Sequence, residues 1–207
     1  MNSRKSHESS PPAFQCVKGC SDCCIEREYF PTEQFGRIGV LLLPNEKTAI
    51  EAEAERLGMT VRIIPRLAVI PGRAGSGEPE ILAFQMMGER GDGRLCPFLD
   101  TASAERSPHG GYKCRIYKDR PLACRAYPLL SIGQKGTIET AELDEHCAFC
   151  KQSGTSRANL AGLERERESL AIIQSTVTAK ENDTILRYAT ATGDEGVSML
   201  PEGWVVE

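Results

Sequence analysis

The 207-residue chain lacks several features that would assign a function at once. No segment approaches the roughly 20 consecutive apolar residues of a membrane-spanning helix. Residues 1–15 contain no apolar run of signal-peptide length, so we expect the chain to be cytoplasmic. There is no Gly-rich phosphate loop, no internal repeat, and no carboxylate pair or Cys-His pair that can be assigned to catalysis. We therefore name no catalytic residue and leave enzyme activity open.

The overall composition is that of an ordinary soluble globular protein, with 40% hydrophobic and 26% charged residues and a net charge of −4. An acidic total argues against a dedicated nucleic-acid binder, and we expect neither nucleic acid nor membrane as a partner. The charge is unevenly placed, because residues 112–127 carry five basic side chains against the single Asp119. This run brackets Cys114 and Cys124. Cations beside thiolates lower the thiol pKa and offset the charge of a sulfur-rich metal site, which favours such a site over a solvated face.

Cysteine is abundant, with nine residues, four of which fall in the pattern C-x3-C-x2-C-C between residues 16 and 24. A chain of this size can bury a core without disulfide bonds, which are typical of small secreted proteins. In a reducing cytoplasm, thiolates this close repel one another unless a cation lies between them. We therefore predict metal binding, with a redox-sensing dithiol as the alternative.

A closed tetrahedral site usually takes ligands from two separate places in the chain, and the later cysteines supply the second place. The candidate metal ligands are Cys16, Cys20, Cys23, Cys24, Cys96, Cys114, Cys124 and Cys147. An odd total of nine leaves at least one thiol outside if each metal takes four. We expect this to be Cys150 or one of Cys23 and Cys24, because neighbours in an extended chain point to opposite sides.

Zinc and iron-sulfur clusters both accept four thiolates. The unpaired cysteines, the absence of a repeated C-x2-C spacing, and the cationic and aromatic surroundings of Cys114 and Cys124 favour a [4Fe-4S] cluster over zinc. At a zinc site, His109 or His146 could replace a sulfur. We expect Arg120 and Arg125 to lie at the cofactor and to donate hydrogen bonds to thiolates or to nearby carbonyls.

We expect an α+β fold: a small cysteine-rich metal-binding domain with loop-borne ligands, short β-hairpins and a helical C-terminal extension. The predicted parts are a disordered lead over residues 1–13, the cysteine-cluster domain over 14–152, and the extension over 153–207, packed on the same domain. Periodicity and turn residues predict helices over 33–43, 46–57 (capped by Asn45), 155–177 and 184–189, and strands over 60–70, 80–87 and 134–141, the first two paired as a hairpin. The apolar stripe from Leu160 to Val177 is interpreted as core or as a docking face for a protein partner.

Three parts of the cysteine pattern resemble a known family. They are Phe14-x-Cys16-x3-Cys20-x2-Cys23-Cys24, Cys96-Pro-Phe-Leu, and Cys114-Arg-Ile-Tyr-Lys-Asp-Arg-Pro-Leu-Ala-Cys124-Arg-Ala-Tyr-Pro128. Over residues 14–150 the chain resembles the YkgJ-type cysteine-cluster family, a zinc- or iron-chelating CxxCxxCC domain. It departs from the family's name in having three residues, not two, between Cys16 and Cys20.

The resemblance implies metal chelation, with an electron-transfer, metal-handling or structural role. It also implies a relation to flagellin lysine N-methylases. The alternative function is therefore a protein lysine methyltransferase that depends on a cluster or on S-adenosylmethionine.

The spacing Cys16-x3-Cys20-x2-Cys23 is also that of radical S-adenosylmethionine enzymes. Their fold places the motif after the first strand of a barrel, whereas only a polar segment precedes Cys16 here, and no repeated βα series follows. We therefore rank this interpretation below the others.

Overall fold

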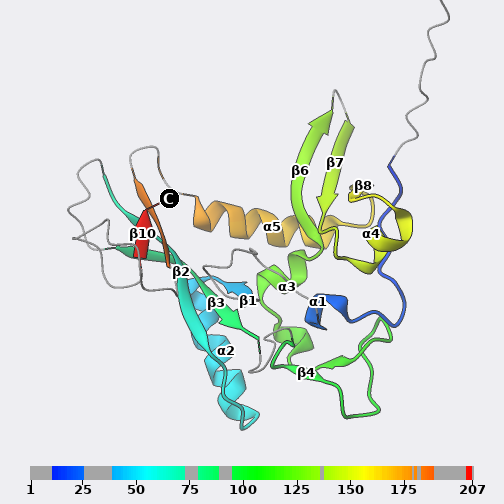
Figure 1. The fold of residues 1–207 in the computed structure, drawn as a ribbon, viewed down its shortest axis with the longest axis horizontal. Coiled ribbons are helices and arrows are strands. Elements are labelled where there is room, and N and C mark those ends of the chain that lie inside the picture. The colour runs from blue at the N-terminus through cyan, green and yellow to red at the C-terminus, as the bar shows by residue number, and fades with distance from the viewer. Residues whose placement is uncertain are drawn as a thin grey trace, which may run out of the picture.

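The computed structural model describes residues 11–25, 39–72, 79–88, 95–135, 138–178, 180, 183–188 and 204–206. These residues form an α+β fold, as predicted (Figure 1). The pairs between the named strands are all antiparallel, so the described residues contain no parallel barrel of the radical-enzyme type. Within the same residues, no helix is long and apolar enough to cross a membrane. Residues 1–10 of the predicted lead lie outside the described part.

The larger sheet has five strands in the order β1-β3-β2-β9-β10. Their bounds are β1 Gly39–Leu42, β2 Ile63–Ile70, β3 Glu80–Met87, β9 Thr184–Tyr188 and β10 Trp204–Val206. The predicted hairpin is confirmed, because β2 pairs with β3 from Ile63 opposite Met86 to Val69 opposite Glu80. The buried residues are Arg66, Ala68, Val69 and Ile70 on β2 and Ala83, Gln85 and Met86 on β3.

Two predicted helices were wrong because their apolar runs are strands of this sheet. Of the run predicted over 33–43, residues 33–38 lie outside the described part, and Gly39–Leu42 is β1, paired with β3. The helix predicted over 184–189 is strand β9 through Tyr188, paired with β2. Short apolar runs have no clear period, and a partner strand far away in sequence decides their conformation.

Helix α2 (Pro44–Arg56) follows β1 and is confirmed as a scaffold helix with Ile50 and Ala54 buried. The N-cap of α2 is Leu43, not the predicted Asn45. The Glu46 carboxylate, inside the first turn, accepts a hydrogen bond from the backbone N–H of this N-cap residue. Glu46 Oε2 accepts a hydrogen bond from Leu43 N at 2.9 Å, and Glu46 Oε1 accepts one from Leu122 N at 2.7 Å. One side chain therefore joins the start of α2 to the start of the helix that carries Cys124.

A second sheet contains β6 (Leu129–Lys135), β7 (Ile138–Leu143) and β8 (Arg157–Asn159) in that order. The single strand predicted over 134–141 is thus parts of two strands, and residues 136 and 137 between them lie outside the described part. The helix predicted from residue 155 begins at Glu164, because the segment before it pairs with β7 and buries Ala158. Helix α5 runs over Glu164–Val177.

The apolar stripe of α5 belongs to the core, since Leu163 and Leu170 share a buried cluster with Cys147 and Cys150. This burial argues against a docking face on these two residues. The cluster crosses the boundary predicted at residue 152, so the C-terminal segment packs against the cysteine-bearing part. Pro11 to Ala13 of the predicted lead lie beside β8, because Asn159 N donates to Pro12 O at 3.0 Å and Ala13 forms a β-bridge with Asn159.

Small elements carry five of the nine cysteines, and most of these elements are drawn below α5 in Figure 1. They are α1 Asp22–Ile25, β4 Leu99–Asp100, β5 Lys113–Cys114, the 3-10 helix η2 Tyr117–Asp119, α3 Leu122–Ala126 and α4 Ala148–Ser153. Helix α3 packs on α5 and β1, so its position is set by the larger fold and not by local sequence.

Replacement of Glu46 tests the link between α2 and α3. Glu46→Ala removes two hydrogen bonds to a charged acceptor and leaves two part-buried N–H groups without it. We expect the free energy of unfolding to fall by about 2–4 kcal/mol, measured by urea denaturation. Glu51→Ala is the matched control on the same helix, because it removes only the exposed ion pair with Lys47 and should change stability little. Equal effects of the two variants would contradict the linking role of Glu46.

Candidate metal centre

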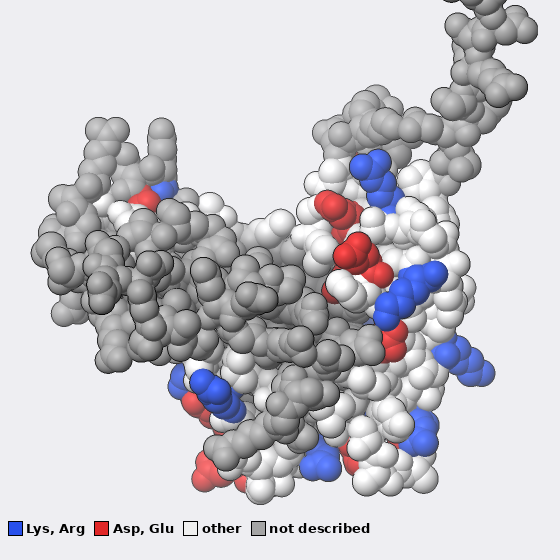
Figure 2. All heavy atoms as spheres, viewed as in Figure 1, with Lys and Arg blue, Asp and Glu red and all other residues white. Residues whose placement is uncertain are grey.

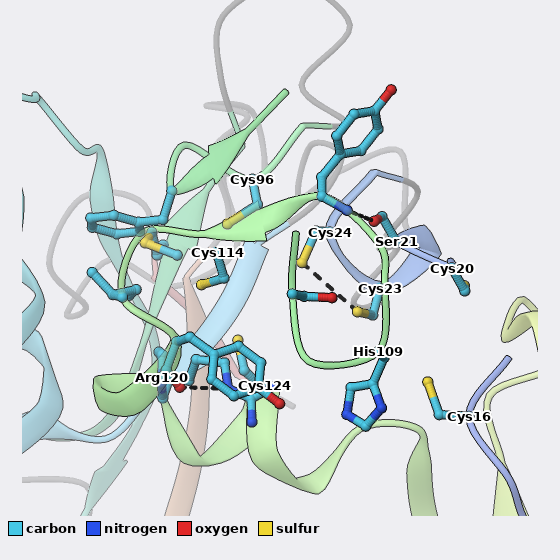
Figure 3. Close-up of a pocket in the computed structure, with 17 residues that line it drawn as sticks. Cys16, Cys20, Ser21, Cys23, Cys24, Cys96, His109, Cys114, Arg120 and Cys124 are labelled. Atoms are coloured by element: carbon cyan, nitrogen blue, oxygen red, sulfur yellow. Dashed lines mark hydrogen bonds between the residues drawn. The ribbon is translucent and has the colours of Figure 1, made fainter. Parts of the chain in front are cut away.

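Two adjoining cavities bring eight of the nine cysteines together. The first, of about 90 Å³, is lined by Cys16, Cys20, Cys23, Cys24, Cys96, Cys114 and Cys124. The second, of about 280 Å³, is lined by Cys16, Cys20, Cys23, Cys124 and Cys147. Figure 3 shows the first cavity, with Cys24, Cys96, Cys114 and Cys124 on one side of Cys23 and with Cys16 and Cys20 on the other. All eight predicted ligands therefore line this region, and Cys150 lines neither cavity.

Backbone hydrogen bonds position three of the thiols at the first cavity. Cys96 N donates to Cys24 O at 2.8 Å, which fixes the segment before β4 against α1. Strand β4 then pairs with β5, where Leu99 lies opposite Cys114. Phe98 between them is fully buried and forms part of the cavity wall. Cys24, Cys96 and Cys114 are thus tied together through main-chain bonds.

Cys124 is presented from helix α3. Pro121 is the N-cap of α3, and Arg120 before it is extended, with φ −60° and ψ 140°. Cys124 N donates to Pro121 O at 2.9 Å within the first turn. We refer below to Cys24, Cys96, Cys114 and Cys124 as the inner thiols.

Cys23 and Cys24 lie on α1, with their sulfur atoms 3.8 Å apart. The premise that they belong to an extended segment was wrong, because Cys24 N and Ile25 N both bond to Ser21 O and begin a helical turn. Successive side chains diverge by about 100° on a helix, compared with about 180° on a strand. Both sulfurs can therefore border the first cavity, while only Cys23 also borders the second.

The loop from Ser107 to Tyr112 closes one side of the first cavity. Gly19 N donates to His109 O at 2.7 Å, and Tyr112 N donates to the buried Ser21 Oγ at 2.7 Å. A Cβ atom on Gly111 would lie 2.1 Å from Cys20 O and 2.4 Å from Ser21 Oγ. Only glycine lets the two loops approach this closely. No local sequence pattern indicates the close contact of Gly111 with the first cysteine loop.

The two candidate histidines differ in position. His109 lines both cavities and could replace a sulfur, as predicted for zinc. His146 is exposed and its Nδ1 lies 3.1 Å from Asp144 Oδ1. His146 lines neither cavity, so of the two only His109 lies among the predicted ligands.

The predicted cofactor-binding arginines both line the second cavity. Arg120 also lines the first, where its guanidinium lies 3.9 Å from the Tyr117 ring centre and Nε donates to Tyr117 O. Arg125 Nε donates to Arg120 O at 2.7 Å. Both side chains therefore bond to backbone carbonyls, and their role toward a cofactor stays a prediction.

On the face shown in Figure 2, basic and acidic side chains of the described residues are interspersed.

Burial raises the pKa of the thiols around the cavities. The pKa values of Cys20 and Cys114 rise to about 11, and desolvation is the largest cause. The hydrogen bond with Cys23, followed by burial, raises the pKa of Cys24 far above its ordinary value. Burial, followed by the charges of Cys23 and Cys147, raises the pKa of Cys16. Without a cation, the thiols whose pKa rises are therefore neutral at pH 7.

Thiolate is the metal-binding form of cysteine, so an ion must displace protons from these groups. Among the described residues, no three His, Cys, Asp or Glu side chains lie close enough together to ligate one ion as they stand. The donor set itself suits zinc or iron, since both accept all-thiolate coordination.

A family model described as "CxxCxxCC: Putative zinc- or iron-chelating domain" matches residues 15–151. The chain belongs to the CxxCxxCC family. No curated protein and no solved structure gives a significant match. The family confirms the resemblance seen in the sequence and gives the chain a zinc- or iron-chelating domain. The matched range contains all nine cysteines, including the eight that line the two cavities.

Several residues that shape this CxxCxxCC domain were not predicted. Ser21, Glu46 and the Phe14–Phe149 pair act through contacts between distant segments. Their residue types are common in turns, helices and cores, so no local pattern marks them. Phe14 was noted only as part of the family motif.

Substitution of Gly111 tests whether the loop contact is needed for the metal centre. Gly111→Ala should push the 107–112 loop away from Cys20 and Ser21, lowering the free energy of unfolding by about 1–3 kcal/mol and reducing bound metal per chain. Metal analysis and urea denaturation measure the two effects. Gly133→Ala is the control, because its Cβ would meet only Thr140 Oγ1 at an ordinary 3.6 Å. Wild-type metal content in Gly111→Ala would show that the contact is dispensable.

Metal affinity should rise with pH. Cys20 and Cys114 have pKa values of about 11 and hold their protons at neutral pH. Raising the pH from about 6 to 8 reduces the competition from protons, so the apparent affinity for Zn²⁺ should increase and each thiol ligand should release about one proton on binding. Competition with a chromophoric chelator and a pH-stat titration measure these quantities. An affinity that is independent of pH would contradict the protonated state of the metal-free thiols.

Proposed function

We propose that this chain is a metal-binding protein whose inner thiols hold a [4Fe-4S] cluster, with zinc as the competing occupant. The observation that carries the proposal is the convergence of Cys24, Cys96, Cys114 and Cys124 on one cavity from four separate segments. Four thiolates from separate segments form the usual closed ligand set of either metal group. The proposal is consistent with the family's zinc- or iron-chelating description.

The surroundings of the first cavity favour a cluster. About 90 Å³ of space lies among its lining residues. Phe98, Ile116 and Met86 are buried in its wall and limit the access of water. Arg120 supplies positive charge beside the thiolates. These residues would set the reduction potential of a bound cluster, which supplies one-electron transfer.

The roles that fit such a centre are electron transfer, metal handling and structural support. A second candidate, the protein lysine methyltransferase that depends on a cluster or on S-adenosylmethionine, is favoured by one observation. The second cavity, of about 280 Å³, adjoins the thiols and has aromatic and charged walls, including Phe14, Tyr127 and Glu166. A purely structural centre needs no such pocket, whereas a substrate or cofactor does.

Metal analysis of the protein purified without oxygen tests the proposal. We expect about four irons and four acid-labile sulfides per inner centre, with broad visible absorption. Cys124→Ser should lower iron and sulfide content and stability together, because the site and the fold are coupled. Cys150→Ser is the matched control, since this buried thiol lines neither cavity; it should retain its metal even if the substitution lowers stability.

Stoichiometric zinc, without colour or acid-labile sulfide, would show that the inner thiols hold zinc and not a cluster. Full metal content in Cys124→Ser would remove this residue from the ligand set. Equilibrium dialysis of the metal-loaded protein against labelled S-adenosylmethionine distinguishes the second candidate, which requires saturable binding that is weakened by substitutions in the second cavity.

A further inference from the structure

The thiols outside the inner set belong to three segments that two side-chain contacts bring together. Phe14, two residues before Cys16, packs edge-to-face on Phe149 of α4, with ring centres 5.2 Å apart. Phe149 is two residues after Cys147, the N-cap of that helix. The aromatic pair therefore holds the segment that carries Cys16 against the start of α4.

The second contact joins α1 to the same helix. Asp22 Oδ2 lies 3.6 Å from Lys151 Nζ in a partly exposed ion pair, so the helix that carries Cys23 lies beside α4. On α1, the sequence neighbours Cys23 and Cys24 diverge: Cys24 lines the first cavity only, whereas Cys23 also lines the second. Cys16 and Cys20 also line both cavities, Cys147 lines only the second, and Cys124 is the one inner thiol that lines the second cavity as well. We refer to Cys16, Cys20, Cys23 and Cys147 as the outer thiols.

We propose that the outer thiols form a second metal site, distinct from the inner one, that binds a single thiophilic divalent ion such as Zn²⁺. The inference rests on the proposed function, because it takes the inner thiols to be the ligands of the first centre. All four outer thiols line the second cavity, and the three segments that carry them are restrained by the Phe14–Phe149 and Asp22–Lys151 contacts. Soft thiolate donors select zinc, Cu(I) or iron over harder cations.

The two sites differ in their access to solvent. Of the outer thiols, Cys16 is exposed and Cys147 is buried, whereas the inner thiols are all half-buried and adjoin the buried Phe98, Ile116 and Met86. An ion in the outer site can therefore be approached from the side of Cys16. A chelator should reach this ion first.

One competing arrangement places Cys23 and Cys24 on the same ion. Their sulfur atoms are 3.8 Å apart, which is also about the separation of two thiolates on a tetrahedral zinc with bonds of about 2.3 Å. In that arrangement the eight thiols would serve one continuous centre, and substitutions in either group would affect all of the bound metal.

Titration of the metal-free full chain with Zn²⁺ alone decides between these arrangements. The wild type should bind two equivalents. Cys16→Ser and Cys147→Ser should each bind one equivalent, at the inner site. Cys96→Ser should also bind one equivalent, at the outer site. Gly133→Ala, on the exposed part of β6, is the control and should bind two equivalents. Circular dichroism identifies folded samples, and Co²⁺ in place of Zn²⁺ gives sulfur-to-metal charge-transfer bands that count the thiolates on each ion.

Release of zinc from the wild type to excess EDTA provides a measurement that does not depend on folded variants. We expect two phases of equal amplitude, with the faster phase at least tenfold faster and absent from Cys16→Ser. Unchanged zinc content in folded Cys16→Ser and Cys147→Ser would overturn the second site and leave the proposed function standing. Single-phase release, or loss of all zinc from every folded thiol variant, would establish one shared centre. Failure of the wild type to bind any metal would overturn the proposed function as well.

Discussion

The anchoring of α1 is the constraint on which the metal centre depends. This four-residue helix carries Cys23 and Cys24 and has no core of its own. It is held by a main-chain bond from Cys96 to Cys24, by the bond from Tyr112 to Ser21, and by the ion pair of Asp22 with Lys151. These contacts come from segments more than 70 residues away in sequence. The position of two central thiols is therefore a property of the whole fold.

Burial gives the centre its chemical character. A thiol in an apolar wall keeps its proton, and the pKa values of about 11 at Cys20 and Cys114 express this preference. A metal ion reverses it, because the cation stabilises thiolates that burial alone disfavours. Part of the free energy of metal binding then stabilises the contacts between loops and short helices, as in other small metal-binding domains. The same coupling explains why the ligands can lie on elements too short to be stable alone.

The sequence predictions were correct for elements that local interactions form, and they were wrong for elements whose partners are distant in sequence. Helix α2 and the β2–β3 hairpin were predicted because their apolar periodicity and turn residues are local. Strands β1 and β9 were predicted as helices, because each is a short apolar run whose partner strand is distant in sequence. The start of α5 was predicted nine residues too early, since the pairing of Ala158 with Ala141 overrides the helical pattern there. For the site, the eight predicted ligands all line the two cavities, but the contacts that bring them together were not predicted.

The sequence by itself determined the chemistry of this protein: an unusual density of thiols, their spacing, and the family pattern that indicates zinc or iron chelation. Ligand type is a property of residue identity, so it can be read without coordinates. Only the tertiary structure decided how the thiols are arranged. The helical turn at Ser21, the Gly111 contact and the Phe14–Phe149 pair place particular sulfurs at particular cavities. Each is a contact or a local conformation that depends on packing between distant segments, which spacing along the chain does not encode.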